Sequence, residues 1–96
     1  MTVRARMIHN FPLERSERQT VEVVGYLDKL DVQIQGGNLT LWCSVLTPGT
    51  EAVPLAIYIV GTGTPIPEGI SLRTYWRTVQ DGRYVWHIFI QEGVRT

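Results

Sequence analysis

The chain has few of the side chains that usually carry chemistry. Its 96 residues include one cysteine, Cys43, and two histidines, His9 and His87, and no spacing among these and the carboxylates is typical of a metal site. The serines do not lie in a nucleophile-elbow sequence. We therefore expect no enzymatic activity, no metal and no cofactor.

Disulfide, export and membrane signals are also missing. A single cysteine cannot form an intramolecular disulfide, and Cys43 lies in an apolar run, which is typical of a core residue in a reducing compartment. The first eight residues lack the apolar region of a signal peptide, and no apolar run approaches the roughly 20 residues that span a bilayer. We expect a cytoplasmic protein without a membrane partner.

Neither sign of charge is in excess. Nine basic residues balance nine acidic ones, and this balance disfavours duplex nucleic acid as a partner, because such binding depends on neutralising phosphates. Lys29 is the only lysine, so the other eight basic residues are arginines, which favour planar and stacked contacts.

What the chain does contain indicates a single all-β domain over residues 1–96. Apolar residues make up 44%, enough for a core, and turn residues recur about every 10 positions between β-branched and aromatic runs. We expect five to seven mainly antiparallel strands, a meander that forms a small barrel or sandwich. The expected strands lie near 3–9, 20–24, 29–35, 39–46, 54–60, 71–80 and 83–91. The short polar segment 13–18 is expected to be a surface loop.

Gly36-Gly37 is typical of a two-residue hairpin loop. Pairing outward from it brings six apolar residues onto one face: Ile34 with Leu39, Val32 with Leu41 and Leu30 with Cys43. The other face then carries Asp31, Gln33, Thr40 and Trp42. A slip by one residue would bury the polar set, so the pattern specifies this register.

Asp81-Gly82 predicts a second hairpin. Its predicted pairs are Val79 with Tyr84, Arg77 with Trp86, Tyr75 with Ile88 and Arg73 with Ile90 on one face, and Thr78 with Val85, Trp76 with His87 and Thr74 with Phe89 on the other. Neither face is cleanly polar. Together with an exposed Trp42, this pattern favours a homo-oligomer or a second covering layer.

Five short motifs resemble, in the same order, those of a small protein family. They are Asn10-Phe11-Pro12-Leu13-Glu14, Val32-Gln33-Ile34-Gln35 with Leu39-Thr40-Leu41-Trp42, Val60-Gly61-Thr62-Gly63 with Pro65-Ile66-Pro67, Thr78-Val79-Gln80 and Val85-Trp86-His87-Ile88-Phe89. The family comprises short proteins of unknown function encoded by bacteriophages and prophages. The resemblance implies phage origin and a small accessory role, and it supplies no catalytic residues. Family members usually carry histidine where this chain has Thr64.

Two groups of residues are candidate binding sites. The turn Gly61-Thr62-Gly63-Thr64 could present amide groups to an anion, although we expect a structural turn that uses positive φ at its glycines. The second group combines arginine with aromatic residues, as interface hot spots do, and could equally be a core edge. It comprises Arg73, Tyr75, Arg77, Tyr84 and Trp86, with His87 and Trp42. His87 could contact a ligand or be a half-buried residue whose partner is a threonine or the backbone.

These features support two hypotheses about function. The first is a phage-encoded, non-enzymatic protein that binds a host protein and is a candidate inhibitor of a bacterial antiviral defence system. The second is a small-ligand binder that sequesters a nucleotide or another phosphorylated metabolite, with the Gly61–Gly63 amides on the phosphate and an arginine or tryptophan side chain stacked on the base.

Overall fold

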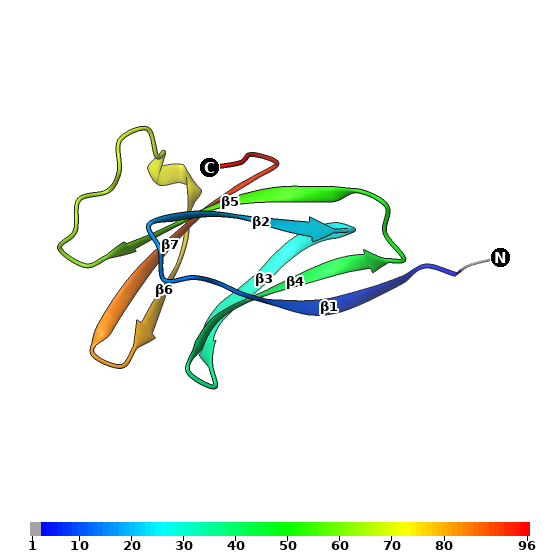
Figure 1. Cartoon of the computed structure of the whole chain (residues 1–96), viewed down its shortest axis with the longest axis horizontal. Helices are drawn as coiled ribbons and strands as arrows, with labels where there is room; N and C mark the ends of the chain where they lie inside the picture. The colour runs from blue at the N-terminus through cyan, green and yellow to red at the C-terminus, as the bar shows by residue number, and fades with distance from the viewer. Residues whose placement is uncertain (1–2) are drawn as a thin grey trace.

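The computed structural model describes residues 3–96 and is all-β, as predicted (Figure 1). Seven strands follow one another along the chain: β1 (Ala5–Pro12), β2 (Arg18–Val24), β3 (Tyr26–Gln35), β4 (Asn38–Thr47), β5 (Ala52–Gly61), β6 (Tyr75–Asp81) and β7 (Tyr84–Glu92). The helical content of residues 3–96 is one short 3-10 segment, η1 (Leu72–Thr74). No helix in this part of the chain is long and apolar enough to span a membrane.

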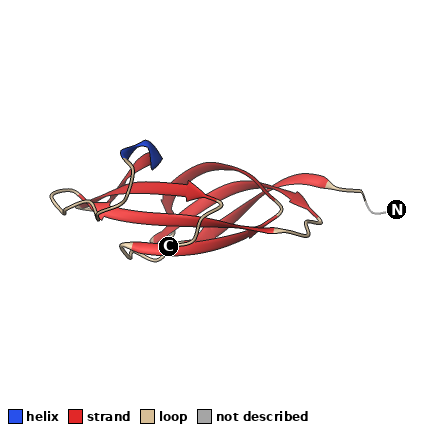
Figure 2. Cartoon of the chain, turned by 90° about the horizontal axis from the view of Figure 1, so that it is seen from above, coloured by secondary structure: helices blue, strands red, loops and turns tan. Residues whose placement is uncertain are grey.

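The strands form two antiparallel sheets, with the orders β1-β4-β3 and β2-β5-β7-β6. One cluster of buried side chains joins the two sheets, so the fold is a sandwich and not a closed barrel. Its extents of 53 × 31 × 18 Å give the flat outline of Figure 2. The expected meander is wrong in detail, because β7 lies between β5 and β6 and the chain must cross over it.

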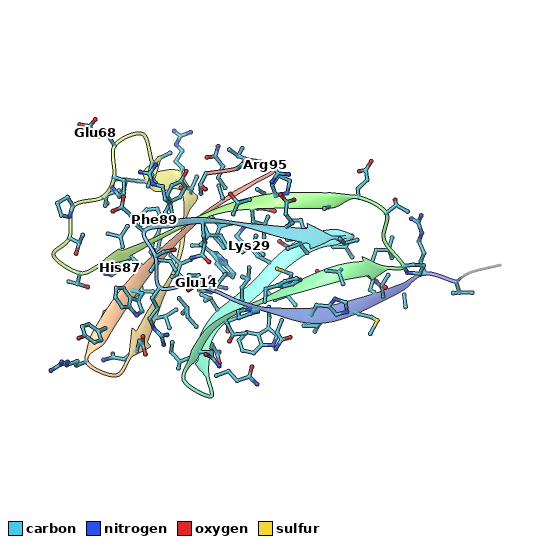
Figure 3. The ribbon with its side chains drawn as sticks, in the orientation of Figure 1. Glu14, Lys29, Glu68, His87, Phe89 and Arg95 are labelled. Atoms are coloured by element: carbon cyan, nitrogen blue, oxygen red, sulfur yellow. The ribbon has the colours of Figure 1, made fainter. Side chains whose placement is uncertain are left out.

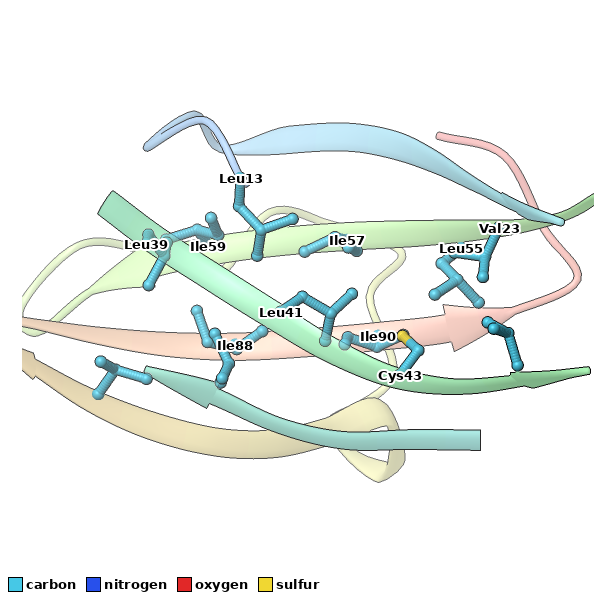
Figure 4. Close-up of a cluster of buried hydrophobic side chains, with 13 residues drawn as sticks. Leu13, Val23, Leu39, Leu41, Cys43, Leu55, Ile57, Ile59, Ile88 and Ile90 are labelled. Atoms are coloured by element: carbon cyan, nitrogen blue, oxygen red, sulfur yellow. The ribbon is translucent and has the colours of Figure 1, made fainter. Parts of the chain in front are cut away.

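The core lies between the sheets, where alternate residues of both point inward (Figure 4). Leu41 and Cys43 of β4 face Ile57 and Ile88 of the other sheet, and all four are fully buried. Leu13 also belongs to this core and donates its amide to the Leu39 carbonyl at 2.8 Å. The segment after β1 is therefore a loop whose first residue is a core side chain, not a surface loop throughout.

The β3–β4 hairpin turns at Gly36-Gly37, and the predicted pairs next to the loop are confirmed. The predicted pairing of Leu30 with Cys43 is wrong, because a bulge between Lys29 and Asp31 places Lys29 opposite Cys43. This shift directs the Lys29 ammonium to the Glu92 carboxylate at 2.9 Å, and Leu30 is 39% exposed.

One residue of the expected polar face of this hairpin is buried. Thr40 is 5% exposed, and its hydroxyl donates to the Asn38 carbonyl at 3.0 Å. Burial is tolerated because this hydrogen bond satisfies the hydroxyl group.

The β6–β7 hairpin turns one residue later than predicted, at Gly82-Arg83, and Asp81 pairs with Tyr84. The predicted pairs are therefore wrong: Val79 lies opposite Trp86, and Thr78 lies opposite His87. The reason is that the Asp81 carboxylate accepts hydrogen bonds from neighbouring side chains at the end of the strand, whereas Gly82 supplies the positive φ of 60° that the turn needs.

The strand expected over 71–80 begins only at Tyr75. The residues just before Tyr75 form the 3-10 segment η1 instead. Ser71 caps this segment, because its hydroxyl accepts a hydrogen bond from the Arg73 amide at 3.2 Å. A bulge between Tyr75 and Arg77 then changes the register with β7. The connection over residues 62–74 thus leads from β5 past β7 to β6 (Figure 1). Residues of this connection form one wall of a pocket.

Candidate functional site

A pocket of about 450 Å³ lies between the outer face of the four-stranded sheet and the 62–74 connection. Figure 3 shows His87 and Phe89 on one strand, β7, beside the loop that carries Glu68. The pocket is lined by Val60, Gly61, Thr62, Gly63, Thr64, Ile66, Leu72, Tyr75, His87 and Phe89. The lining contains no aspartate, glutamate, lysine or arginine.

The floor of the pocket is apolar although it lies on the outer side of the sandwich. Phe89 is only 3% exposed, and Val60 beside it is also buried. The ring of Tyr75 meets Phe89 edge to face, with centroids 5.7 Å apart. On the rim, Ile66 and Leu72 stay accessible, and Leu72 is 69% exposed. An incoming apolar group would therefore find both a floor and a rim.

A chain of hydroxyl groups runs through the imidazole of His87. Its Nε2 lies 2.8 Å from the Thr62 hydroxyl, and its Nδ1 lies 3.0 Å from the Thr78 hydroxyl. The Thr78 hydroxyl in turn bonds to the phenol of Tyr75. Both ring nitrogens are thus satisfied within the protein, which fixes the ring in one orientation.

The Gly61–Thr64 turn already uses two of its amides internally. Thr62 donates to the Val85 carbonyl at 3.3 Å, and Thr64 donates to the Gly61 carbonyl at 3.1 Å. Positive φ occurs at Gly63 (84°) and not at Gly61, because Gly61 is the last residue of β5 and has extended pairing with Trp86. The amides left for an anion are correspondingly few.

The structure divides the predicted arginine–aromatic group among separate places. Tyr75 belongs to the pocket. Arg77 lies over the ring of Trp76 at 4.9 Å, and it lies opposite Ile88 instead of the predicted Trp86 because the β6 register differs. It also approaches Asp31 of β3 at 3.5 Å, so it belongs to the margin where β3 and β6 meet.

Tyr84 and Trp86 form a second cluster, near the β6–β7 turn. Their rings stack with centroids 5.7 Å apart, and the guanidinium of Arg83 lies 5.4 Å from the Tyr84 centroid. A concavity of about 570 Å³ lies between this cluster and the Gly61–Thr64 turn.

Trp42 and Arg73 lie outside both concavities. Trp42 is half-buried, on the outer face of the other sheet, and Arg73 lies in η1 instead of a strand. The seven residues predicted as one binding group therefore do not form one surface.

Sequence reasoning missed an ion pair that fixes the Tyr84–Trp86 cluster. The Asp81 carboxylate accepts from Arg15 at 2.7 Å and from the Trp86 indole at 2.8 Å. These two hydrogen bonds hold the pKa of Asp81 below its usual range, and the bond from Arg15 has the larger effect. Arg15 also donates to the Gly37 carbonyl at 2.8 Å. No local pattern links these distant positions, so the pair could not be read from the sequence.

Sequence reasoning also missed Ile66, Leu72 and Phe89 as pocket residues. The signal that was available is the presence of three apolar residues, Ile66, Ile70 and Leu72, in a connection otherwise rich in glycine, proline and polar residues. Among residues 3–96, no group of three or more histidine, cysteine or carboxylate side chains is arranged to hold a metal ion.

One known protein family matches nearly the whole chain. A family described as a domain of unknown function, DUF7352, matches residues 4–95. The chain belongs to the DUF7352 family. No curated protein and no solved structure matches it. This match confirms a domain of unknown function over nearly the whole chain, whereas the phage origin and the five motifs stay predictions.

Proposed function

We propose that this DUF7352 protein is phage-encoded and acts in the bacterial cytoplasm by binding a host protein, without catalytic turnover. The observation that carries the proposal is the pocket beside β7, which has an apolar floor at Phe89 and an accessible apolar rim at Leu72. The phage resemblance supports a host protein as the target, and a component of an antiviral defence system is the target we favour.

The chemistry of the pocket suits an apolar side chain of a partner protein. Its volume of about 450 Å³ falls in the range of ordinary ligand sites. Burying about 100 Å² of apolar surface there would contribute about 2.5 kcal/mol. The hydroxyls of Thr62 and Tyr75 lie beside the apolar floor and can bond to the partner's backbone.

The same geometry disfavours catalysis in the pocket. Proton transfer needs a base that can reach a substrate, but both nitrogens of His87 already bond to threonine hydroxyls. The lining contains no carboxylate, cysteine or lysine. Binding by occupancy is the function that these residues support best.

A nucleotide or phosphorylated metabolite is the second candidate, and the concavity beside Tyr84 favours it. Arg83 supplies a cation there, and the Tyr84–Trp86 stack offers an aromatic face to a base. A phosphate would find few free amides in the Gly61–Thr64 turn, because Thr62 and Thr64 direct their amides to carbonyl groups of the protein.

The test compares two exposed apolar positions. Leu72→Glu places a charge on the pocket rim, and Val24→Glu places the same charge on β2 outside the pocket lining. We expect tagged wild-type protein and the Val24 variant to retain the same host protein in stoichiometric amount, and the Leu72 variant to lose it. Equal retention by both variants, or retention of no stoichiometric partner, would contradict the proposal.

A thermal-shift screen addresses the second candidate. A ligand that binds the folded state raises the melting temperature by mass action. Stabilisation by cyclic nucleotides or phosphorylated metabolites that is lost in Arg83→Gln would favour the small-ligand function, and no stabilisation across the screen would remove it.

A further inference from the structure

Strand β1 is a long, regular edge strand. It bonds to β4 alone, at the margin of the three-stranded sheet (Figure 1). The register with β4 runs without a break from Ala5–Thr47 to Pro12–Thr40. An edge of this kind presents a row of main-chain donors and acceptors to any strand that can reach it.

The backbone groups that face outward can be assigned from the register. The Leu13 amide donates to the Leu39 carbonyl, and this pair continues the β1–β4 register. Because backbone groups alternate in direction along an antiparallel strand, the odd-numbered residues of β1 face β4. The N–H and C=O groups of Arg6, Ile8 and Asn10 therefore point away from the sheet.

The edges formed by β3 and β6 differ from this one. Each has a bulge, between Lys29 and Asp31 in β3 and between Tyr75 and Arg77 in β6. An ion pair of Asp31 with Arg77 also connects the two strands. Bulges and charged side chains are the usual means by which sheets discourage pairing at an edge.

The fourth edge, β2, carries charges and is covered in part by the end of the chain. Glu22 forms an ion pair with Arg95, and the Thr20 hydroxyl accepts the Thr96 amide at 2.9 Å. Strand β1 differs from the other three edge strands of residues 3–96, because it has neither a bulge nor an acidic residue.

Apolar side chains are exposed on both faces of β1. Ile8 is 65% exposed on the outer face, and Met7 is 48% exposed on the inner face, where the other sheet does not cover it. A neighbouring strand would bury both side chains in addition to pairing the backbone.

We propose that a second copy of this chain pairs antiparallel with β1, with Ile8 opposite Ile8 of the other copy. Arg6 of each copy then lies opposite Asn10 of the other, and the three pairs share about six backbone hydrogen bonds. The two three-stranded sheets become one continuous six-stranded sheet. The pairing does not involve the pocket and is independent of the proposed function.

Self-pairing fits the charges and the symmetry of the strand. Arg4 and Arg6 would repel another cationic strand in many registers, but pairing centred on Ile8 places Arg6 beside a neutral Asn10. On the inner face the same register sets Met7 beside His9. A two-fold contact uses one surface twice and leaves no free β1 edge for further copies. Since the contact is smaller than a standard interface, we expect a dissociation constant of about 10 μM.

Charge substitutions at the two-fold axis test the register. In Ile8→Lys or in Ile8→Glu alone, like charges would be directly opposed, and we expect dimerisation to weaken about tenfold or more. An equal mixture of the two variants brings opposite charges together and should restore a mass of twice the 10.9 kDa chain in sedimentation equilibrium. The control is Val24→Lys, which should dimerise like the wild type.

Three outcomes of this experiment would overturn the proposal. In the first, the wild-type protein keeps the mass of a monomer well above about 10 μM. In the second, the single charge variants dimerise like the wild type. In the third, the mixture of the two variants keeps the mass of a monomer.

Amide hydrogen exchange on the wild-type protein tests the same contact without a substitution. The amides of Met7 and His9 face β4 and should be protected at every protein concentration. The amides of Arg6, Ile8 and Asn10 should become protected only as the dimer forms. A dimer in which the Ile8 amide exchanges rapidly would overturn the proposal, because its contact would lie elsewhere.

Discussion

The main chain of Gly25 packs directly against that of Leu46. The Leu46 amide donates to the Gly25 carbonyl at 2.7 Å, and a Cβ at Gly25 would lie only 2.1 Å from the Leu46 carbonyl oxygen. The Gly25 amide donates in turn to the Glu51 carbonyl at 2.8 Å. Since Gly25 is the single residue between β2 and β3, this contact sets the point at which the chain passes from one sheet to the other.

We predict that Gly25→Ala destabilises the fold by about 2 kcal/mol or more, because it combines a backbone clash with a φ of 73°. Gly69→Ala is the matched control: its φ is 85°, but its Cβ would meet nothing within 4 Å. It should cost about 1 kcal/mol, the strain of the left-handed conformation alone. Urea unfolding of both variants measures the difference, and equal costs would contradict the packing argument.

The Glu92 carboxylate of β7 links the two sheets through Tyr26 and Lys29 of β3, and we expect this link to be sensitive to acid. It accepts from the Tyr26 phenol at 2.6 Å and from Lys29 at 2.9 Å, and these two bonds lower its pKa. A carboxyl whose pKa is lowered by folding stabilises the protein above its ordinary pKa of about 4.3, and this stabilisation is lost as the pH falls through the lower folded value.

We therefore expect Glu92→Gln to cost about 1 kcal/mol at pH 7, a modest value because the carboxylate is partly solvated. The difference from the wild type should shrink as the pH falls below about 4. Tyr26→Phe should show the same trend, since it removes one of the two donors. Denaturant unfolding at several pH values is the measurement, and a difference that stays constant into acid would exclude this account.

Cys43 should be unreactive in the folded protein. It is fully buried between the sheets, and burial raises the pKa of its thiol to about 11. Because the thiolate is the reactive form, a thiol reagent at pH 8 should modify Cys43 only after unfolding. Modification at the same rate with and without denaturant would show that the core opens readily.

The sequence predicted those parts of the fold that depend on local patterns. Alternation of apolar and polar residues gave the β3–β4 hairpin next to its loop, where Ile34 pairs with Leu39. The pattern failed at Leu30, which the alternation places on the same face as Val32 and Ile34. A bulge turns its side chain outward. This bulge brings Lys29 to Glu92 of the other sheet, a partner 63 residues away, so no short sequence window reveals it.

The candidate site was harder to predict for a similar reason. The 62–74 connection folds over the outer face of β7, so Phe89 lies at the floor of a pocket instead of in the sandwich core. Ion pairs such as Arg15 with Asp81 join residues 66 positions apart. Such contacts depend on the assembled fold, which the residue pattern near either partner does not encode.

The Gly61–Thr64 turn offers a final test, which separates shape from binding. Gly63 has a φ of 84° and open space at its Cβ, so Gly63→Val should cost about 1–2 kcal/mol through backbone strain. Gly61 lacks positive φ, and its Cβ would make contacts of 3.4 Å with Trp86 and Thr64 that small adjustments absorb. Gly61→Ala should therefore cost less.

Thr64→His should leave the melting temperature unchanged, because the side chain of Thr64 is exposed. The position lines both the pocket beside β7 and the concavity beside Tyr84, so a partner or ligand bound in either place should change its affinity. Stability and affinity measured on these three variants distinguish the two roles. A Gly63→Val protein as stable as the wild type that has lost its partner would show that the turn serves binding and not shape.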